Sequence, residues 1–241
     1  MPKINKDSTL NITFVGIGLC LLCSAIISFI AIQLRSVQEN NVVLDMQKKI
    51  VSSAGLDEVY GSVENAMSNI KTLIIDLDRG EIVDINPDTY ELSKELREDG
   101  KYKFLSAEED VASIKKREKY SKVYIEYKDN EINTLILPVR GYGLWGILYG
   151  YLAIEGDFNT VAGLEFYEHK ETPGLGAEID NPKWKALWKG KKIYQENGEV
   201  SLKVIKGSVM KTSDNFSYEI DGLSGATLTC NGAVSYTHLT L

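Results

Sequence analysis

The chain has 241 residues, of which 44% are apolar, and its formal net charge is −7. This length suits one membrane or targeting element followed by one or two domains. The apolar fraction is enough to fill the core of about 200 residues of folded chain. Nucleic acid is excluded as an expected partner, because the acidic chain has no Lys/Arg-rich run with interleaved aromatic residues.

The first predicted element is a stretch of 23 uncharged residues, 12–34, which Arg35 follows directly. About 20 helical residues cross a hydrocarbon core of roughly 30 Å, whereas a cleaved signal peptide has an apolar core of only about 7–15 residues. Residues 27–30, Ile-Ser-Phe-Ile, also make a poor cleavage site. We therefore expect residues 1–11 to be a short tail and 12–34 to be a single uncleaved transmembrane anchor. Lysines lie on both sides of the anchor, so the charges leave its orientation undecided.

The cysteines and histidines do not suggest a metal site. Cys20 and Cys23 are one helical turn apart inside the anchor, where small apolar residues face lipid or a partner helix. Cys230 is then alone in the rest of the chain, which has only two histidines, His169 and His238. A disulfide framework, a thiolate metal site and a histidine metal site are therefore not expected.

After the anchor, residues 35–71 are expected to be a helical juxtamembrane segment, because apolar residues recur at helical spacing between Val43 and Ala54. Turn residues between β-prone runs predict two hairpins, formed by residues 72–77 with 81–85 and by residues 123–127 with 133–139. The charged residues 91–109 are expected to form a surface helix with a loop.

Residues 142–154 are apolar, aromatic and glycine-rich, and they predict strands that approach another backbone closely. Asn181-Pro182 marks the start of a short helix with Trp184, Leu187 and Trp188 on one face. Short strands are expected at 204–207 and 218–220, and a helix after Thr227. Hairpins with interspersed helices predict an α+β domain with a mainly antiparallel sheet.

Two stretches have residue types that are unusual for plain structure. "GYGLWGILYGY", 141–151, is either an aromatic core strand or a surface where Trp or Tyr covers a planar ring beside permissive glycines. "HKETPGLGAE", 169–178, is either a surface loop or a ligand loop that offers backbone N–H groups and a Thr hydroxyl to a polar ring edge. The spacing of a nucleotide-hydrolase phosphate loop is absent.

A third stretch, "DGLSGATLT", 221–229, is either an ordinary turn or a phosphate site. Exposed N–H groups at a helix start, together with Gly225, suit a phosphate. Two hydroxyls follow the Ser-Gly-Ala run, those of Thr227 and Thr229.

Taken in order, "GYGLWGILYGYLAIEGD", "FYEHKETPGLGAEIDNPKW" and "DGLSGATLT" resemble the NqrC family, whose members are one subunit of the sodium-pumping NADH:quinone oxidoreductase. The resemblance runs from about residue 12 to about residue 233, and residues 86–120 are its least distinctive part. The loop and the Ser/Thr-Gly-Ala-Thr motif also occur in the related RnfG family. The Gly-Tyr-Gly-Leu-Trp segment favours NqrC.

The resemblance implies FMN bound covalently, as a phosphoester of Thr227, with Thr229 as the alternative hydroxyl two positions later. In this family a separate flavin transferase, using FAD and Mg²⁺, makes the bond, so no catalytic residue and no metal ligand is expected in this chain. The residues expected around the flavin are Tyr142 and Trp145 to cover the ring, Glu171, Thr172 and Leu175 to face it, Gly174 and Gly176 to shape the loop, Leu223, Ser224, Gly225 and Ala226 around the phosphate end, and Lys206 on the ring or ribityl chain. Asp221 is expected to orient the motif.

The resemblance also implies a relay: electrons enter from iron–sulfur carriers of other subunits and leave to the flavin of the FMN-bearing NqrB subunit, while the six-subunit complex moves Na⁺. The chain has no GxGxxG fingerprint, so direct hydride transfer from NADH is not expected. The implied location is the bacterial inner membrane, with the flavin domain, 72–233, on the periplasmic side. Two alternatives remain: an RnfG-like or free-standing membrane-anchored FMN carrier, and a membrane-anchored binding or sensor domain without a cofactor.

Two features depart from the family. Position 230 is Cys where the family usually has Ser. The last eight residues, "VSYTHLTL", 234–241, do not resemble the family. We therefore expect them to be a non-native tail that replaces the C-terminal part of the domain, and we assign no function to His238.

Overall fold

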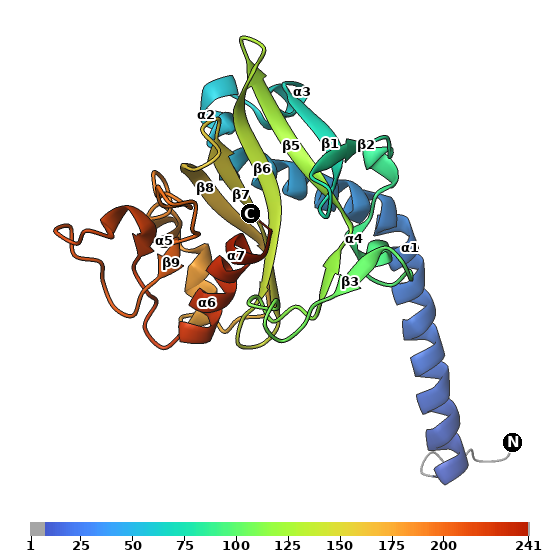
Figure 1. The fold of residues 1–241 in the computed structure, drawn as a ribbon. Helices are drawn as coiled ribbons and strands as arrows, with labels where there is room; N and C mark the ends of the chain where they lie inside the picture. Colours follow the sequence, from blue (N-terminus) through green and yellow to red (C-terminus); the bar gives the residue numbers. More distant parts are fainter. Residues whose placement is uncertain (1–7, 241) are drawn as a thin grey trace, which may run out of the picture. The chain divides into compact units, whose positions relative to one another are not determined.

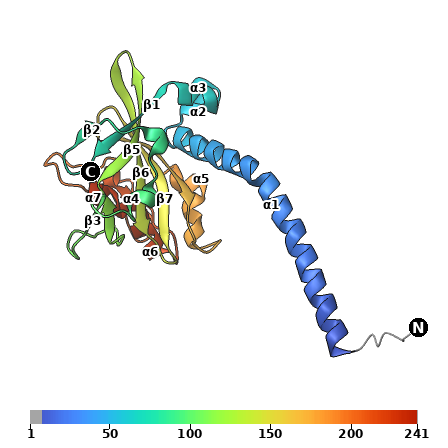
Figure 2. The ribbon, with the colours of Figure 1, turned by 90° about the vertical axis from the view of Figure 1, so that its right-hand side faces the viewer.

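The computed structural model describes residues 8–240, with side chains as far as residue 238. It divides into two compact units, Met1–Met46 and Gln47–Leu241. Helix α1 (Thr9–Ser53) is one continuous helix that includes the predicted anchor (Figure 1 and Figure 2). It is long and apolar enough to cross a membrane, and its most apolar part has no side chain buried in the protein.

The domain is built on one six-stranded antiparallel sheet (Figure 1), as the sequence predicted. Its strand order is β2 (Glu81–Val83), β1 (Ile70–Asp76), β5 (Tyr120–Lys128), β6 (Glu131–Tyr142), β7 (Ile147–Glu155) and β8 (Val161–Glu168). Both predicted hairpins are confirmed, as β1–β2 and β5–β6. Asp129 and Asn130 both have positive φ, of 52° and 68°, which is the backbone that a two-residue hairpin turn requires.

Each face of the sheet is covered by a different set of helices. The end of α1, together with α2 (Leu56–Tyr60) and α3 (Val63–Ser68), brings Ile50 and Val51 against Tyr124 and Tyr151 on one face. On the other face, α5 (Pro182–Lys185) and α6 (Thr227–Ser235) pack with the sheet around the fully buried Trp188. The site described below lies on this second face.

Helix α6 lies directly on the backbone of β6. A Cβ on Gly141 would fall 2.0 Å from the carbonyl oxygen of Gly232, and a Cβ on Gly232 would fall 2.5 Å from the carbonyl oxygen of Tyr142. Real Cβ atoms do not approach that closely, so the contact requires glycine on both elements. Since Thr227 is the first residue of α6, this contact fixes where the third motif lies.

The segment between β2 and β5 is less helical than expected. The only helix within residues 91–109 is the four-residue α4 (Leu92–Glu95). Gly100, with φ of +84°, then precedes β3 (Tyr102–Phe104). This strand pairs with β4 (Lys116–Glu118). The prediction of a surface helix over residues 91–109 is therefore largely wrong. The reason is that this charged segment has no apolar stripe to hold a helix against the sheet.

One further short element, η1 (Pro87–Thr89), lies before α4. The other short elements follow β8 and are η2 (Gly176–Asp180), β9 (Lys203–Val204), η3 (Phe216–Tyr218), β10 (Glu219–Ile220) and α7 (Thr237–Thr240). The predicted start of α5 is confirmed, since the Asn181 side chain accepts from the N–H of Lys183. Trp184 and Trp188 are buried, but Leu187 is 36% exposed because α5 ends at Lys185 and the helical spacing is lost.

Candidate functional site

The structure brings the three motif stretches together around one buried carboxylate. Glu171, in the loop after β8, accepts hydrogen bonds from the backbone N–H of Trp145 (2.9 Å, to Oε1) and from the hydroxyl of Thr229 (2.5 Å, to Oε2). The same loop reaches the third motif, because the Cβ position of Gly225 lies 3.3 Å from Cδ2 of Leu175. Residues far apart in the sequence therefore form one region at the N-terminal end of α6.

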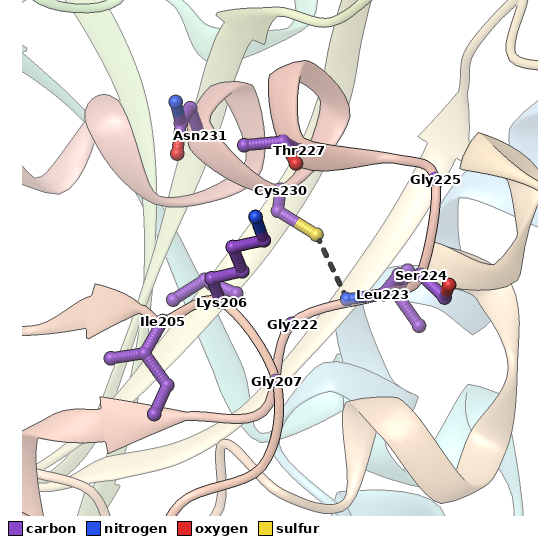
Figure 3. Close-up of a pocket in the computed structure, with 11 residues that line it drawn as sticks. Ile205, Lys206, Gly207, Gly222, Leu223, Ser224, Gly225, Thr227, Cys230 and Asn231 are labelled. Carbon is purple, nitrogen blue, oxygen red and sulfur yellow. Dashed lines mark hydrogen bonds between the residues drawn. The ribbon is translucent and has the colours of Figure 1, made fainter.

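A cavity of about 280 Å³ opens beside the start of α6 (Figure 3). Its walls come from the β9–β10 segments and from α6. The lining residues are Val204, Ile205, Lys206, Gly207, Gly222, Leu223, Ser224, Gly225, Thr227, Cys230 and Asn231. The cavity thus contains most of the residues that the sequence assigned to a phosphate end, while Ala226 is buried within the same turn.

Close backbone contacts hold the turn that leads into α6. The N–H of Gly222 donates to the carbonyl of Gly207 at 2.8 Å, and a Cβ on Gly222 would lie 2.1 Å from the oxygen of Ile205. Asp221 orients this turn from outside the cavity: its carbonyl accepts from Trp184 Nε1 at 2.8 Å, and its Oδ1 accepts from the N–H of Val209 at 2.8 Å.

The two candidate hydroxyls have opposite environments. Thr227 is exposed, lines the cavity and is shown with its hydroxyl on the cavity side (Figure 3). Thr229 is 1% exposed, and its hydroxyl is engaged by Glu171. Of these two hydroxyls, only that of Thr227 belongs to a residue open to solvent.

The cavity favours an anion at the start of α6. The N-cap residue, Ala226, supplies no side-chain hydrogen bond to the first turn of the helix. The N–H groups of a first turn and the helix dipole favour negative charge, and the side chain of Lys206 adds a cation to the same cavity.

Cys230 lines the cavity without being a reactive thiolate. Its Sγ accepts from the N–H of Leu223 at 3.3 Å. Burial raises the pKa of the Cys230 thiol, so the neutral form predominates at pH 7 and the thiol is a poor nucleophile.

Several residues predicted from the sequence lie outside the cavity. Tyr142, Trp145 and Leu175 are 47%, 63% and 48% exposed, and Thr172 and Gly174 lie on the exposed part of their loop. Glu171, which the resemblance places at the flavin edge, is buried, and each of its carboxylate oxygens accepts a hydrogen bond from another segment of the chain. Gly176 packs against the same carboxylate.

Five lining residues were not expected from the sequence: Val204, Ile205, Gly207, Gly222 and Asn231. Asn231 had a usable signal, because it lies four residues after Thr227 and therefore on the same face of a helix. The two glycines had none, since their contact joins segments separated by a loop. Among the residues that the structure describes, no group of three His, Cys, Asp or Glu side chains is placed to hold a metal ion.

Comparison with known proteins places the chain in a family. The model of the FMN-binding domain family matches residues 143–241. The NqrC subunit of the Na(+)-translocating NADH-quinone reductase of Pseudomonas aeruginosa is 45% identical over 242 residues, covering 98% of this chain and 93% of that protein. The corresponding protein of Vibrio anguillarum is 42% identical over 228 residues, covering 95% and 88%.

Two solved structures are similar as well. The crystal structure of Shewanella oneidensis NqrC superposes with a TM-score of 0.71 at 29% identity, covering 80% of this chain and 88% of that one. The corresponding protein from Parabacteroides distasonis superposes with a TM-score of 0.62 at 28% identity, covering 85% and 92%. The chain therefore belongs to the NqrC family of subunits of the Na⁺-translocating NADH-quinone reductase.

Proposed function

We propose that the chain carries FMN as a phosphoester of Thr227 and relays electrons between subunits of the Na⁺-translocating complex. The observation that carries the proposal is the contrast between the exposed Thr227 hydroxyl at the start of α6 and the buried, hydrogen-bonded hydroxyl of Thr229. A bound flavin supplies reversible electron transfer, and the protein binds it and tunes its potential.

The residues of the cavity suit the phosphate end of such a group. Thr227 supplies the ester oxygen, Lys206 a positive charge, and the first turn of α6 its N–H groups. Gly225, with φ of +73°, allows the backbone to turn closely around that position. The cavity thus offers one attachment oxygen and several groups that favour negative charge.

The ring end extends beyond the cavity. About 280 Å³ is at the lower limit of small-molecule pockets, which span roughly 300–1,000 Å³. The walls formed by Val204, Ile205 and Leu223 are apolar. The exposed side chains of Tyr142 and Trp145 are the candidates to cover the rest of the ring.

Attachment is a transfer of the FMN moiety from FAD. The Thr227 oxygen forms a bond to the flavin-side phosphorus, the pyrophosphate P–O bond breaks, and AMP leaves. The hydroxyl proton passes to a base of the flavin transferase. This chain contributes the exposed nucleophile and the anion-favouring turn, and it needs no base of its own.

In the complex, electrons reach the domain from iron–sulfur carriers of other subunits and leave to the flavin of the NqrB subunit. Residues 12–34 span the bacterial inner membrane, and the flavin domain lies on its periplasmic side. What supports this arrangement is the family of the chain, the length and apolar character of α1, and its continuity with the domain as far as Ser53.

The proposal is tested by producing the full chain with a flavin transferase and inspecting a denaturing gel under ultraviolet light. A fluorescent band at the mass of the chain is expected, because a phosphoester survives denaturation while a bound but unattached flavin is lost. A sample made without the transferase is the control and is expected to stay dark. A dark band in the presence of an active transferase would overturn the proposal.

A further inference from the structure

Glu171 has an arrangement that its expected contact with the flavin does not explain. We propose that Glu171 is a positioning residue, which holds the start of α6 in the place where Thr227 receives the flavin, and that Thr229 is its hydrogen-bond donor. That Thr227 receives flavin rests on the proposed function. The two hydrogen bonds of Glu171 do not, because they form in the chain without cofactor.

Each oxygen of the carboxylate binds a different segment. Oε1 accepts from the N–H of Trp145, 26 residues earlier in the chain, and Oε2 accepts from the hydroxyl of Thr229, 58 residues later. Glu171 itself belongs to the loop after β8. One carboxylate therefore joins the β6–β7 connection, the loop after β8 and α6, and no other described side chain bonds to these same three segments at once.

Thr229 transmits this constraint to Thr227. The two residues lie in the first turn of α6, so a tie at the Thr229 side chain also restrains the backbone that carries Thr227. Gly141 and Gly232 hold the helix against β6 farther along its length. The hydrogen bond to Glu171 ties the first turn of α6 to the loop after β8.

Two glycines make the space for the carboxylate. A Cβ on Gly143 would lie 2.7 Å from Oε1, and a Cβ on Gly176 would lie 2.5 Å from Oε2 and 2.8 Å from the Thr229 hydroxyl. Neither glycine has a positive φ, so the backbone does not require glycine at either position. The space taken by the Glu171–Thr229 pair gives the reason for the second glycine of the Pro-Gly-Leu-Gly loop.

The carboxylate depends on these donors because it is 6% exposed and belongs to none of the ion pairs formed by the described residues. A buried charge that loses a hydrogen-bond donor keeps its desolvation cost. Any movement that separates Glu171 from Thr229 is therefore unfavourable, and this restrains the first turn of α6 relative to the loop after β8.

The first test uses the full chain without flavin and measures amide hydrogen exchange at Trp145. The Trp145 side chain is exposed, so protection of its N–H depends on the bond to Glu171. In Glu171→Ala we expect exchange at Trp145 to quicken by about tenfold or more, and in Glu171→Gln, which keeps an acceptor oxygen, we expect protection to persist. The amide of the buried Leu152 reports whether the domain stays folded.

The second test measures the rate at which the transferase loads flavin onto the same variants. Loading is expected to fall about tenfold or more in Glu171→Ala and in Thr229→Val, and to stay near that of the wild type in Glu171→Gln and Thr229→Ser. Thr134→Val, which removes a buried hydroxyl from β6 away from the site, is the matched control and is expected to load normally.

The outcomes separate this inference from the proposed function. Unchanged Trp145 exchange in Glu171→Ala, or normal loading of Thr229→Val, would overturn the positioning role. Flavin loading that falls only in variants whose Leu152 amide also loses protection would overturn the positioning role as well. In that case the loss of loading would come from unfolding of the domain. If the wild type takes up no flavin, the proposed function fails, and the exchange measurement still decides whether Glu171 joins the three segments.

Discussion

Thr227→Ala is expected to lose the covalent flavin completely, with a fall in band fluorescence of about a hundredfold or more on a denaturing gel. The substitution removes the oxygen that forms the ester, and Thr229 cannot replace it because its hydroxyl is buried and bound to Glu171. Since Thr227 is exposed, its loss is expected to change the free energy of unfolding by less than about 0.5 kcal/mol. The effect is therefore one of chemistry and not of folding.

Thr227→Ser is the matched variant, because it keeps a hydroxyl at the same position without the methyl group. It is expected to retain a fluorescent band. Ser224→Ala removes an exposed hydroxyl from the same cavity and is expected to leave the band in place. Fluorescence that persists in Thr227→Ala would contradict the assignment.

The second large effect concerns stability. Gly141→Ala places a Cβ where the structure allows only 2.0 Å to the carbonyl oxygen of Gly232, so α6 must move away from β6. Overpacking of this kind costs about 1–3 kcal/mol and occasionally more. We expect a loss of about 3 kcal/mol in the free energy of unfolding, measured by urea denaturation of the full chain in detergent.

Gly146→Ala is the control for this measurement. It lies in the β6–β7 connection, has no positive φ, and its Cβ would meet Lys170 Cδ at an ordinary 3.5 Å. Its unfolding free energy is expected to stay within about 0.5 kcal/mol of the wild type. Equal stability of the Gly141 and Gly146 variants would show that α6 does not rest directly on β6.

Local signals predicted most of the fold. The hairpin at Asp129-Asn130 and the helix start at Asn181-Pro182 are confirmed, because each depends on residues within a few positions of one another. The prediction for 91–109 was wrong, since charge alone does not decide between a helix and short strands. The predicted boundary at residue 234 falls inside α6, and Tyr236 is buried with its hydroxyl donating to Glu118 Oε1 at 3.0 Å.

The site was predictable where its chemistry lies within one motif. Thr227 and Gly225, both expected at the phosphate end, line the cavity, and so does Lys206, which was expected on the ring or ribityl chain. The place of Glu171 was not predictable, because its partners lie 26 and 58 residues away and only the fold brings them together. The same reason hides the role of Thr229, whose hydroxyl looks equivalent to that of Thr227 in the sequence alone.

Mass spectrometry of the loaded chain after trypsin digestion shows which residue carries the flavin. Lys211 is the last Lys or Arg in the chain, so Thr227 and Thr229 lie in one peptide, 212–241, and fragment ions between them decide the position. We predict a peptide heavier by one FMN phosphoester, with the added mass on Thr227. The added mass on Thr229, or an unmodified peptide from protein that has been exposed to an active transferase, would show that Thr227 is not the attachment site.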